Sequence, residues 1–370
     1  MRTAADQRNR LTGDASALKR EMRRVHLLPV LSVLPVLSVL SVLSVLSVLS
    51  VLSALSALSA QAQSPLAVIG GESAPVGQEI GQLGPMLVTS RHVLIFDKAD
   101  KLLRVYDLKG APVQTVGRSG AGPGEYRFVY AMARDSSRHV LLLDPANGRV
   151  TIYVEGDTLR LLRTRPIELS GYGLCTAGDM LFVSGSQEDG MVHQFKLEAS
   201  GGGNLRSFGE PQLRGPLGQN QMIRERLGNS PMACVPGQPV VMLGSASLGV
   251  IQIVHTDMQN ERAVELPGFE RMTITPGERS LTFGVPESGH YDMLVEMQPA
   301  PGGAVATVHR VGGKTDDSME YRRYFIAPTG AVRLLGSSAW RQIGAEDGKV
   351  YCGGENPYPE VAVFQGAVCP

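Results

Sequence analysis

The chain has 370 residues and no net formal charge, but residues 1–62 differ in composition from the remainder. They contain 7 of the 35 basic residues, 3 of the 35 acidic residues and no aromatic residue. The remaining 308 residues hold 28 basic and 32 acidic side chains, a net charge of −4. This balance excludes a dedicated nucleic-acid-binding protein, because affinity for phosphate requires clustered Lys and Arg. Their 42 glycines indicate frequent tight turns and short strands.

Residues 1–62 have the features of an export signal. A basic segment at 19–24 precedes a run of Val-Leu-Ser triplets, and Ala60-Gln61-Ala62 supplies a small-x-small cleavage pattern. We expect cleavage before Gln63, with Met22 as an alternative start of translation. Because the apolar run is about 30 residues long, an uncleaved membrane anchor is the alternative. In both cases residues 63–370 are expected to be periplasmic or secreted.

Four cysteines lie in the exported part, at Cys175, Cys234, Cys352 and Cys369. An even number in an oxidising compartment predicts disulfides. Cys352 and Cys369 are expected on or beside neighbouring antiparallel strands, within bonding distance, so we predict that they pair. Cys175 and Cys234 form the second candidate pair, although they occupy equivalent points of successive repeats, where side chains tend to point the same way. No C-x-x-C or zinc-type spacing is present.

An internal repeat runs through residues 63–370. Residues 91–97 (RHVLIFD) return 47 positions later at 138–144 (RHVLLLD), and a second pattern around Cys175 returns 59 positions later around Cys234. Six strand-rich units are visible, about 51 residues each, which predicts an all-β, six-bladed β-propeller of four-stranded antiparallel blades. Seven blades or a β-sandwich are the alternatives. The last unit has only three strands, and residues 66–80 precede the first unit and belong to none. We therefore expect this N-terminal segment to pair with the C-terminal strand and close the ring.

One segment carries a family resemblance. Residues 116–126 (VGRSGAGPGEY) resemble the G-R-x-G-x-G-P-G-E-[FY] linker of bacterial six-bladed β-propellers related to the NHL repeat. Residues 93–107 and 140–153 resemble the blade core of that family, with Asp144, Asn147 and Arg149 in place in the second unit. The resemblance covers about residues 67–165. It implies the propeller fold and leaves the function open, because propellers include binding modules, lyases, lactonases and peptidases.

The linker residues are expected to have structural roles. The glycines permit a positive φ in a sharp crossover, the proline fixes one φ, and the glutamate can accept hydrogen bonds from backbone N–H groups. These residues are Gly117, Gly120, Gly122, Pro123, Gly124 and Glu125. Asp97 and Asp144 are expected to bind local backbone at strand ends. Calcium binding by these two aspartates is the alternative, and otherwise no cofactor or metal site is predicted.

No catalytic motif is present. The sequence lacks G-x-S-x-G, H-E-x-x-H and a phosphate-binding loop, and Ser288, His290 and Asp292 are too close in sequence for an ordinary triad. The inner strands expected in five units contain no Asp, Glu or His, while the inner strand of the fifth unit cannot be assigned from the pattern. The residues expected at the mouth of the channel are Tyr130, Tyr172, Trp340 and Arg341, with packing between blades as the alternative for each.

The sequence therefore favours an exported, monomeric NHL-like propeller that acts as a binding or interaction module for a protein, peptide or glycan. One alternative is a hydrolase or lyase, lactonase-like, with its site in the divergent residues 200–300. Another is a surface scaffold held by an uncleaved membrane anchor. Three or more carboxylates or histidines at one mouth would favour the enzyme, and a channel lined by apolar and aromatic groups would favour the binder. The helix-like segment 215–229 is interpreted as a surface insertion or a lid.

Overall fold

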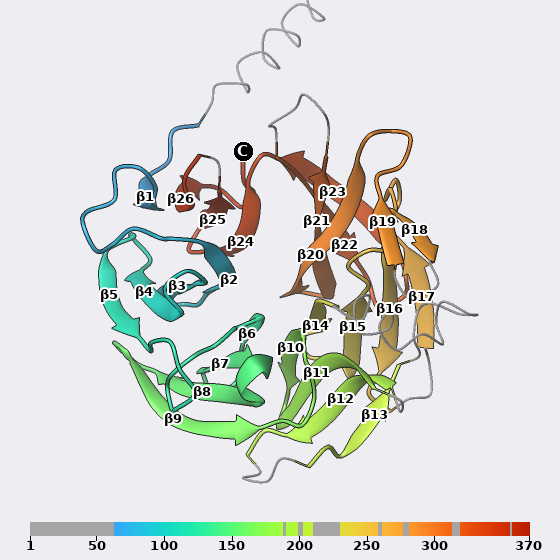
Figure 1. Cartoon of the computed structure of the whole chain (residues 1–370), viewed down its shortest axis with the longest axis horizontal. Coiled ribbons are helices and arrows are strands. Elements are labelled where there is room, and N and C mark those ends of the chain that lie inside the picture. Colours follow the sequence, from blue (N-terminus) through green and yellow to red (C-terminus); the bar gives the residue numbers. More distant parts are fainter. Residues whose placement is uncertain are drawn as a thin grey trace, which may run out of the picture. The chain divides into compact units, whose positions relative to one another are not determined.

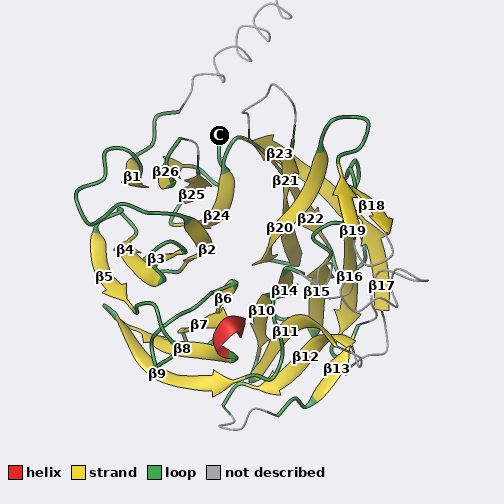
Figure 2. Ribbon diagram, in the orientation of Figure 1, coloured by secondary structure: helices red, strands yellow, loops and turns green. Residues whose placement is uncertain are grey.

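The computed structural model describes residues 63–187, 190–198, 203–209, 230–257, 261–276, 281–312, 319–355 and 357–370. Six four-stranded antiparallel sheets are arranged around a central axis (Figure 1), which confirms the six-bladed β-propeller and excludes the seven-bladed and sandwich alternatives. The described residues contain no α-helix, and their one helical turn is the 3-10 helix η1 (Pro145–Asn147) (Figure 2). The expected signal peptide (1–62) and the segment 215–229 lie outside the described residues.

The first three blades follow each other along the chain, each from its innermost to its outermost strand. Blade 1 consists of β2 (Leu83–Val88), β3 (His92–Asp97), β4 (Leu102–Asp107) and β5 (Pro112–Val116). Blade 2 consists of β6 (Ala131–Arg134), β7 (His139–Asp144), β8 (Arg149–Glu155) and β9 (Leu159–Pro166). Blade 3 consists of β10 (Gly173–Ala177), β11 (Met180–Gln187), β12 (Gly190–Lys196) and β13 (Arg206–Phe208).

The second half of the ring adds a hairpin to the pattern. Blade 4 consists of β14 (Met232–Cys234), β15 (Val240–Gly244), β16 (Val250–His255) and β17 (Glu261–Glu265). A separate two-stranded sheet of β18 (Thr273–Pro276) and β19 (Leu281–Gly284) follows. Blade 5 consists of β20 (Tyr291–Ala300), β21 (Gly303–Val311), β22 (Glu320–Ile326) and β23 (Val332–Ser338). Blade 6 contains β24 (Arg341–Glu346), β25 (Lys349–Gly354), β26 (Glu360–Gln365) and, from the other end, β1 (Ala67–Gly70).

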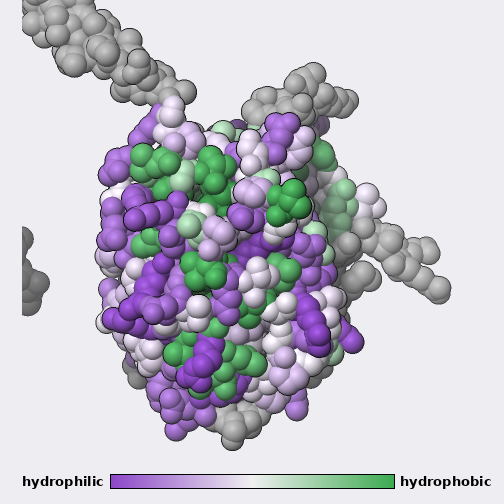
Figure 3. All heavy atoms as spheres, turned by 90° about the vertical axis from the view of Figure 1, so that its left-hand side faces the viewer, coloured by the Kyte–Doolittle hydropathy of each residue, from purple (hydrophilic) through white to green (hydrophobic). Residues whose placement is uncertain are grey.

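The middle strands of the blades are buried on both faces. Every residue of β3 is buried, whereas the outer strand β5 is mostly exposed or half-buried. A middle strand lies between two neighbouring blades, so both of its faces meet apolar side chains, and its sequence is a continuous apolar run. The outer rim on the side of β5 mixes polar and apolar side chains (Figure 3), including the exposed Val113.

Strand register confirms the repeats found in the sequence. Leu94 of β3 pairs with Val105 of β4, and the residues 47 positions later, Leu141 and Ile152, pair in the same way in blade 2. The 59-residue repeat is also preserved, because Cys175 pairs with Phe182 in blade 3 and Cys234 pairs with Val241 in blade 4. Equivalent sequence positions therefore occupy equivalent places in successive blades.

Strands from both ends of the chain close the ring. β1 pairs antiparallel with β26, with Ala67 opposite Val363 and Gly70 opposite Glu360. The N-terminal strand is therefore the outermost strand of blade 6 and lies beside the C-terminal strand (Figure 1). Ile69 of β1 is 2% exposed and belongs to an apolar cluster shared with blade 1. The expected closure by N- and C-terminal strands is confirmed.

Both candidate disulfides are formed. Cys352 of β25 and Cys369, beyond β26, have Cα atoms 5.9 Å apart, and the bond ties the C-terminal residues to blade 6. Cys175 and Cys234 have Cα atoms 5.5 Å apart, and their bond joins the inner strands of blades 3 and 4. The second pair forms although its members are equivalent, because β10 and β14 lie side by side near the axis, where neighbouring blades come closest.

Candidate binding site

A cavity of about 410 Å³ lies on the axis of the propeller. Its walls come from the six inner strands, β2, β6, β10, β14, β20 and β24, together with the residues that precede three of them. Lys98 in the β3–β4 turn and Ala246 in the β15–β16 turn complete the lining. Because every blade contributes, the ring geometry brings together residues that are up to 257 positions apart, such as Gly84 and Arg341.

Most of the residues that line the cavity are apolar. Five methionines from four blades face the cavity, and these are Met86, Met132, Met232, Met293 and Met297. Methionine is unbranched and polarisable, so it can adjust to ligands of different shape and contacts aromatic groups favourably. Such a wall suits an apolar ligand surface.

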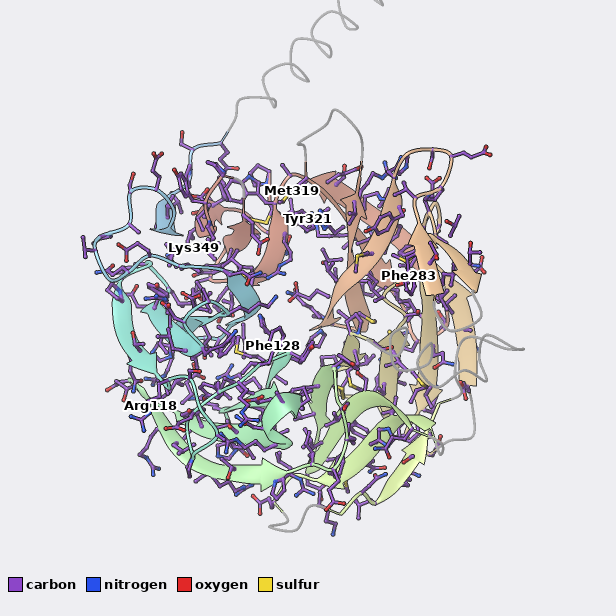
Figure 4. The ribbon with its side chains drawn as sticks, in the orientation of Figure 1. Arg118, Phe128, Phe283, Met319, Tyr321 and Lys349 are labelled. Carbon is purple, nitrogen blue, oxygen red and sulfur yellow. A yellow bond between two sulfur atoms is a disulfide. The ribbon has the colours of Figure 1, made fainter. Side chains whose placement is uncertain are left out.

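Three aromatic rings form a cluster on the side of blades 2 and 3. Phe128 lies near the centre of the propeller in Figure 4. The centroid of its aromatic ring is 4.7 Å from that of Tyr130. Tyr130 is 5.1 Å from Tyr172 in an edge-to-face contact. Tyr130 is 38% exposed, which is unusual for so large a ring in the interior of a fold. The cluster offers a partly exposed aromatic contact surface with its rings at different angles.

Three charged side chains line the same cavity: Lys98, Glu296 and Arg341. Arg341 donates from Nη2 to the carbonyl oxygen of Gly84 at 3.1 Å, and its Nε lies 3.9 Å from Oε2 of Glu296. The amide of Gln298 donates to Oε1 of Glu296 at 3.0 Å. The charged groups come from blades 1, 5 and 6, whereas the aromatic cluster comes from blades 2 and 3.

Burial shifts the pKa of two of these groups toward the neutral form. Desolvation raises the pKa of Glu296, although the nearby Arg341 and the hydrogen bond from Gln298 oppose the change. Desolvation also lowers the pKa of Lys98, the positive charge of Arg341 lowers it further, and Glu355 acts in the opposite direction. Perturbed groups gathered in a cavity are a common sign of a functional site.

The residues expected at the channel mouth divide into two groups. Tyr130, Tyr172 and Arg341 line the cavity, while Trp340 is absent from its lining. Trp340 packs with its ring centroid 5.9 Å from that of Phe364, against the apolar cluster that contains the Cys352–Cys369 pair. Trp340 thus packs within its own blade 6, which differs from the packing between blades named as its alternative, and a binding role for the other three stays a prediction.

The linker motif has a clear geometry. Glu125 accepts hydrogen bonds from the backbone N–H of Gly122 at 2.8 Å and from Nε of Arg118 at 2.7 Å, and these bonds lower its pKa. A Cβ on Gly117, which has φ +89°, would lie 2.4 Å from the ring of Tyr126, so this position requires glycine. Gly120 and Gly124 also have positive φ. Pro123 stands between Gly122 and Gly124 at the tip of the loop.

Blade 2 holds this loop through the motif residues of its own core. Arg149 donates to the carbonyl oxygens of Ala121, Gly122 and Glu125, and Asn147 donates to that of Gly120. In blade 1 the motif asparagine and arginine are replaced by Asp100 and Leu102. There Arg104 reaches Asp97, Asp100 and the carbonyl oxygen of Gly77, and it anchors the preceding segment in a similar way.

Asp97 and Asp144 are buried and bind backbone. Asp97 accepts from the N–H groups of Gly81 and Gln82, and Asp144 accepts from those of Arg127 and Phe128. Each aspartate thus fixes the segment that leads into the inner strand of its blade. Within the part of the chain that the structure describes, no group of three or more His, Cys, Asp or Glu is placed to hold a metal ion.

The short Ser-His-Asp spacing is not a triad. Ser288 bonds the carbonyl oxygen of His290, His290 pairs with Glu270 at 2.8 Å, and the buried Asp292 accepts from the N–H of Glu270. Asp292 also pairs with Arg310 and Arg322. These contacts stabilise the start of β20.

The sequence analysis missed two of the three charged residues that line the cavity, Lys98 and Glu296. β20 is the inner strand of blade 5, and it carries Glu296, the one carboxylate that the described residues contribute to the lining. Its alternation of apolar residues at 294 and 297 with polar residues at 296 and 298 is broken by a bulge between Leu294 and Glu296, which hides the strand pattern. Lys98 belongs to a turn, and no sequence signal marks it as a cavity residue.

Comparisons show the fold and little more. No family model matches the chain, and no curated protein matches it significantly. A DUF4221-family protein from Bacteroides vulgatus has a similar structure, with a TM-score of 0.50 and 8% identity over 77% of this chain and 92% of that one. The WD40 repeats of RRP9 give a TM-score of 0.51 and 10% identity over 82% of this chain and 99% of that one.

A putative exported protein from Bacteroides fragilis gives a TM-score of 0.49 at 13% identity, over 83% of this chain and 94% of that one. At these identities the first two likenesses establish a propeller fold and leave activity undefined. Across the described residues, no helix has both the length and the apolar character needed to cross a membrane. The chain is therefore a six-bladed β-propeller with an axial cavity.

Proposed function

We propose that residues 63–370 form an exported binding module whose ligand occupies the central cavity. The observation that carries the proposal is the lining of that cavity, which combines methionines and the aromatic cluster with a small set of charged groups. Apolar side chains combined with a few convergent polar groups are the usual lining of a small-ligand site. The partner is a peptide, a glycan or another small molecule, and the protein acts as a monomer without a metal cofactor.

Export is the second part of the proposal. Two disulfides among the described residues suit an oxidising compartment outside the cytoplasm. The signal-like segment 1–62 agrees with this location, and we propose that cleavage leaves Gln63 as the first residue. Intact-mass measurement of the secreted or periplasmic protein tests the point, and recovery of only full-length, membrane-bound chain would contradict it.

We also propose that the chain is a divergent relative of the NHL-related propellers. Support comes from the linker sequence at 116–126 and from the way Asp144, Asn147 and Arg149 hold that segment of the molecule. The motif residues act together in one loop, as a shared structural motif requires. This relationship concerns the fold and its connections, and the ligand site must be argued separately.

The hydrolase or lyase alternative rests on Glu296. A carboxyl group with a raised pKa in a cavity could act as a general acid or base. It is the single carboxylate in a lining that includes no histidine among the described residues, so it lacks the partners that such chemistry commonly uses. A panel of lactones and esters tests this alternative: turnover that disappears in E296Q would favour the enzyme.

Affinity selection with matched variants tests the binding proposal. The purified protein is incubated with culture medium and periplasmic extract, and retained compounds and peptides are identified by mass spectrometry. We expect the same species on the wild type and on Y358A, and their loss from Y130A. Tyr130 and Tyr358 are similarly exposed, at 38% and 46%, but only Tyr130 lines the cavity. Equal retention by Y130A and the wild type would contradict a cavity site.

A further inference from the structure

The positive charge of the cavity is not balanced by the residues around it. Lys98 lines the cavity and is partly buried, yet its ammonium group has no hydrogen bond or ion pair with any residue that the structure describes. The polar contacts of Lys98 with the described residues are made by its backbone: its N–H donates to the carbonyl oxygen of Gln82, and its carbonyl oxygen accepts from Nζ of Lys101. A partly buried ammonium group without a partner is costly, and an anion in the cavity would relieve that cost.

Arg341 adds a second cation to the same wall. Its guanidinium donates to the carbonyl oxygen of Gly84, and its nearest carboxylate, on Glu296, is 3.9 Å away. About one fifth of the Arg341 side chain stays exposed, so part of its donor fork is available to a ligand. A guanidinium fork fits the oxygens of a carboxylate or a phosphate group.

Glu296 is poorly placed to balance both cations, because it reaches Arg341 only at 3.9 Å and makes no contact with Lys98. Its Oε2 is buried and has no hydrogen-bond partner, and desolvation raises its pKa. In its protonated form Glu296 adds no negative charge and becomes a donor that could bond an anionic oxygen. The other nearby carboxylate, Glu355, is exposed and lies outside the cavity lining.

The rest of the wall excludes a purely inorganic ion as the best ligand. The five lining methionines and the aromatic cluster of Phe128, Tyr130 and Tyr172 add an apolar surface to the cavity that holds the two cations. A simple anion would leave that surface in contact with water, whereas a molecule with an apolar body would cover it.

We infer that the central cavity binds a small amphipathic anion. Its carboxylate or phosphate headgroup pairs with Lys98 and Arg341, and its hydrocarbon or aromatic body packs on the methionines and tyrosines. This inference rests on the proposed binding function and narrows its ligand to one chemical class.

Calorimetric titration with a matched series of octyl compounds tests the inference. The probes are octanoate, octyl phosphate, octanol and octyltrimethylammonium, which share one apolar body. We expect one or both anions to bind at least about ten-fold more tightly than octanol and the cation, as one charge-assisted hydrogen bond can provide. The stronger of the two anions identifies the headgroup.

Charge-removing variants assign the effect to the cavity. K98M should weaken binding of the anion by about ten-fold or more and leave octanol binding unchanged. K109M removes a lysine from the exposed β4–β5 turn and should behave as the wild type. Because the Lys98 ammonium makes no bond to the described residues, K98M should also melt no lower than the wild type. R341K provides a second variant, which keeps the positive charge but loses the paired donors of the guanidinium group.

The outcomes separate this inference from the proposed function. If octanol binds as tightly as octanoate, or if K98M binds the anions normally, the inference is wrong while a cavity site for an uncharged ligand remains. If no octyl compound binds, the ligand class is wrong and affinity selection still tests the site. If binding is unchanged in Y130A, the compounds bind elsewhere, and both the inference and the cavity site are contradicted.

Discussion

Closure of the ring by β1 predicts that one buried side chain there controls the stability of the whole propeller. Ile69 is 2% exposed and packs with Ile80, Tyr106 and Val363, next to the turn at Gly110, so it joins blade 6 to blade 1. I69A removes three carbon atoms from this seam. Large-to-small substitutions of this kind cost about 2–5 kcal/mol in free energy of unfolding. In a domain of this size that corresponds to a melting temperature lower by about 4–10 °C.

Urea denaturation and calorimetry of the purified protein measure the effect. The neighbouring Val68 is 48% exposed in the same strand, so V68A should change the free energy of unfolding by less than about 0.5 kcal/mol. Removal of residues 64–80 should be more severe and cause aggregation, because it exposes the edge of β26. The reasoning fails if I69A and V68A have the same melting temperature, or if the truncated protein melts at the temperature of its parent.

Three further changes test other parts of the account. C369S should lower the free energy of unfolding by about 3 kcal/mol, as expected for a 17-residue loop, and equal urea midpoints for variant and wild type would contradict this role. E296Q should have the same free energy of unfolding as the wild type at about pH 4 and a higher one at about pH 8. The reason is that ionisation of the buried Glu296 destabilises the wild type as the pH rises through its raised pKa. A difference that is independent of pH would contradict this cause. R149A removes three bonds to the linker and should cost about 2 kcal/mol, whereas R160A, at an exposed position of β9, should cost almost nothing in the same denaturation assay.

Much of the fold could be predicted from the sequence because the repeats preserve register. The 47-residue and 59-residue spacings each map one strand pair onto its equivalent in the next blade. The unpaired segment at 66–80 indicated the closing strand, since a ring leaves no free edge. The hairpin β18–β19 was not predicted, because it interrupts the repeat and has no counterpart in another blade.

The site could be predicted only in part. Tyr130 and Tyr172 precede inner strands that the sequence pattern indicates, and both line the cavity, while their binding role stays a prediction. Trp340 precedes an inner strand in the same way, but its ring packs against Phe364, and strand position alone does not determine the direction of a side chain. Lys98 and Glu296 meet only because blades 1 and 5 both face the axis, a long-range relationship that no local spacing encodes.

The central claim is that the cavity on the axis is where the ligand binds, and hydrogen exchange of the loaded protein tests it most directly. The protein is compared with and without the species that affinity selection retains, and amide exchange is followed by mass spectrometry. The account predicts slower exchange in peptides covering 126–132 and 291–298, which supply the aromatic and charged walls. Protection confined to the outer rim, for example around Val113 or Leu161, with no change at the inner strands, would contradict it.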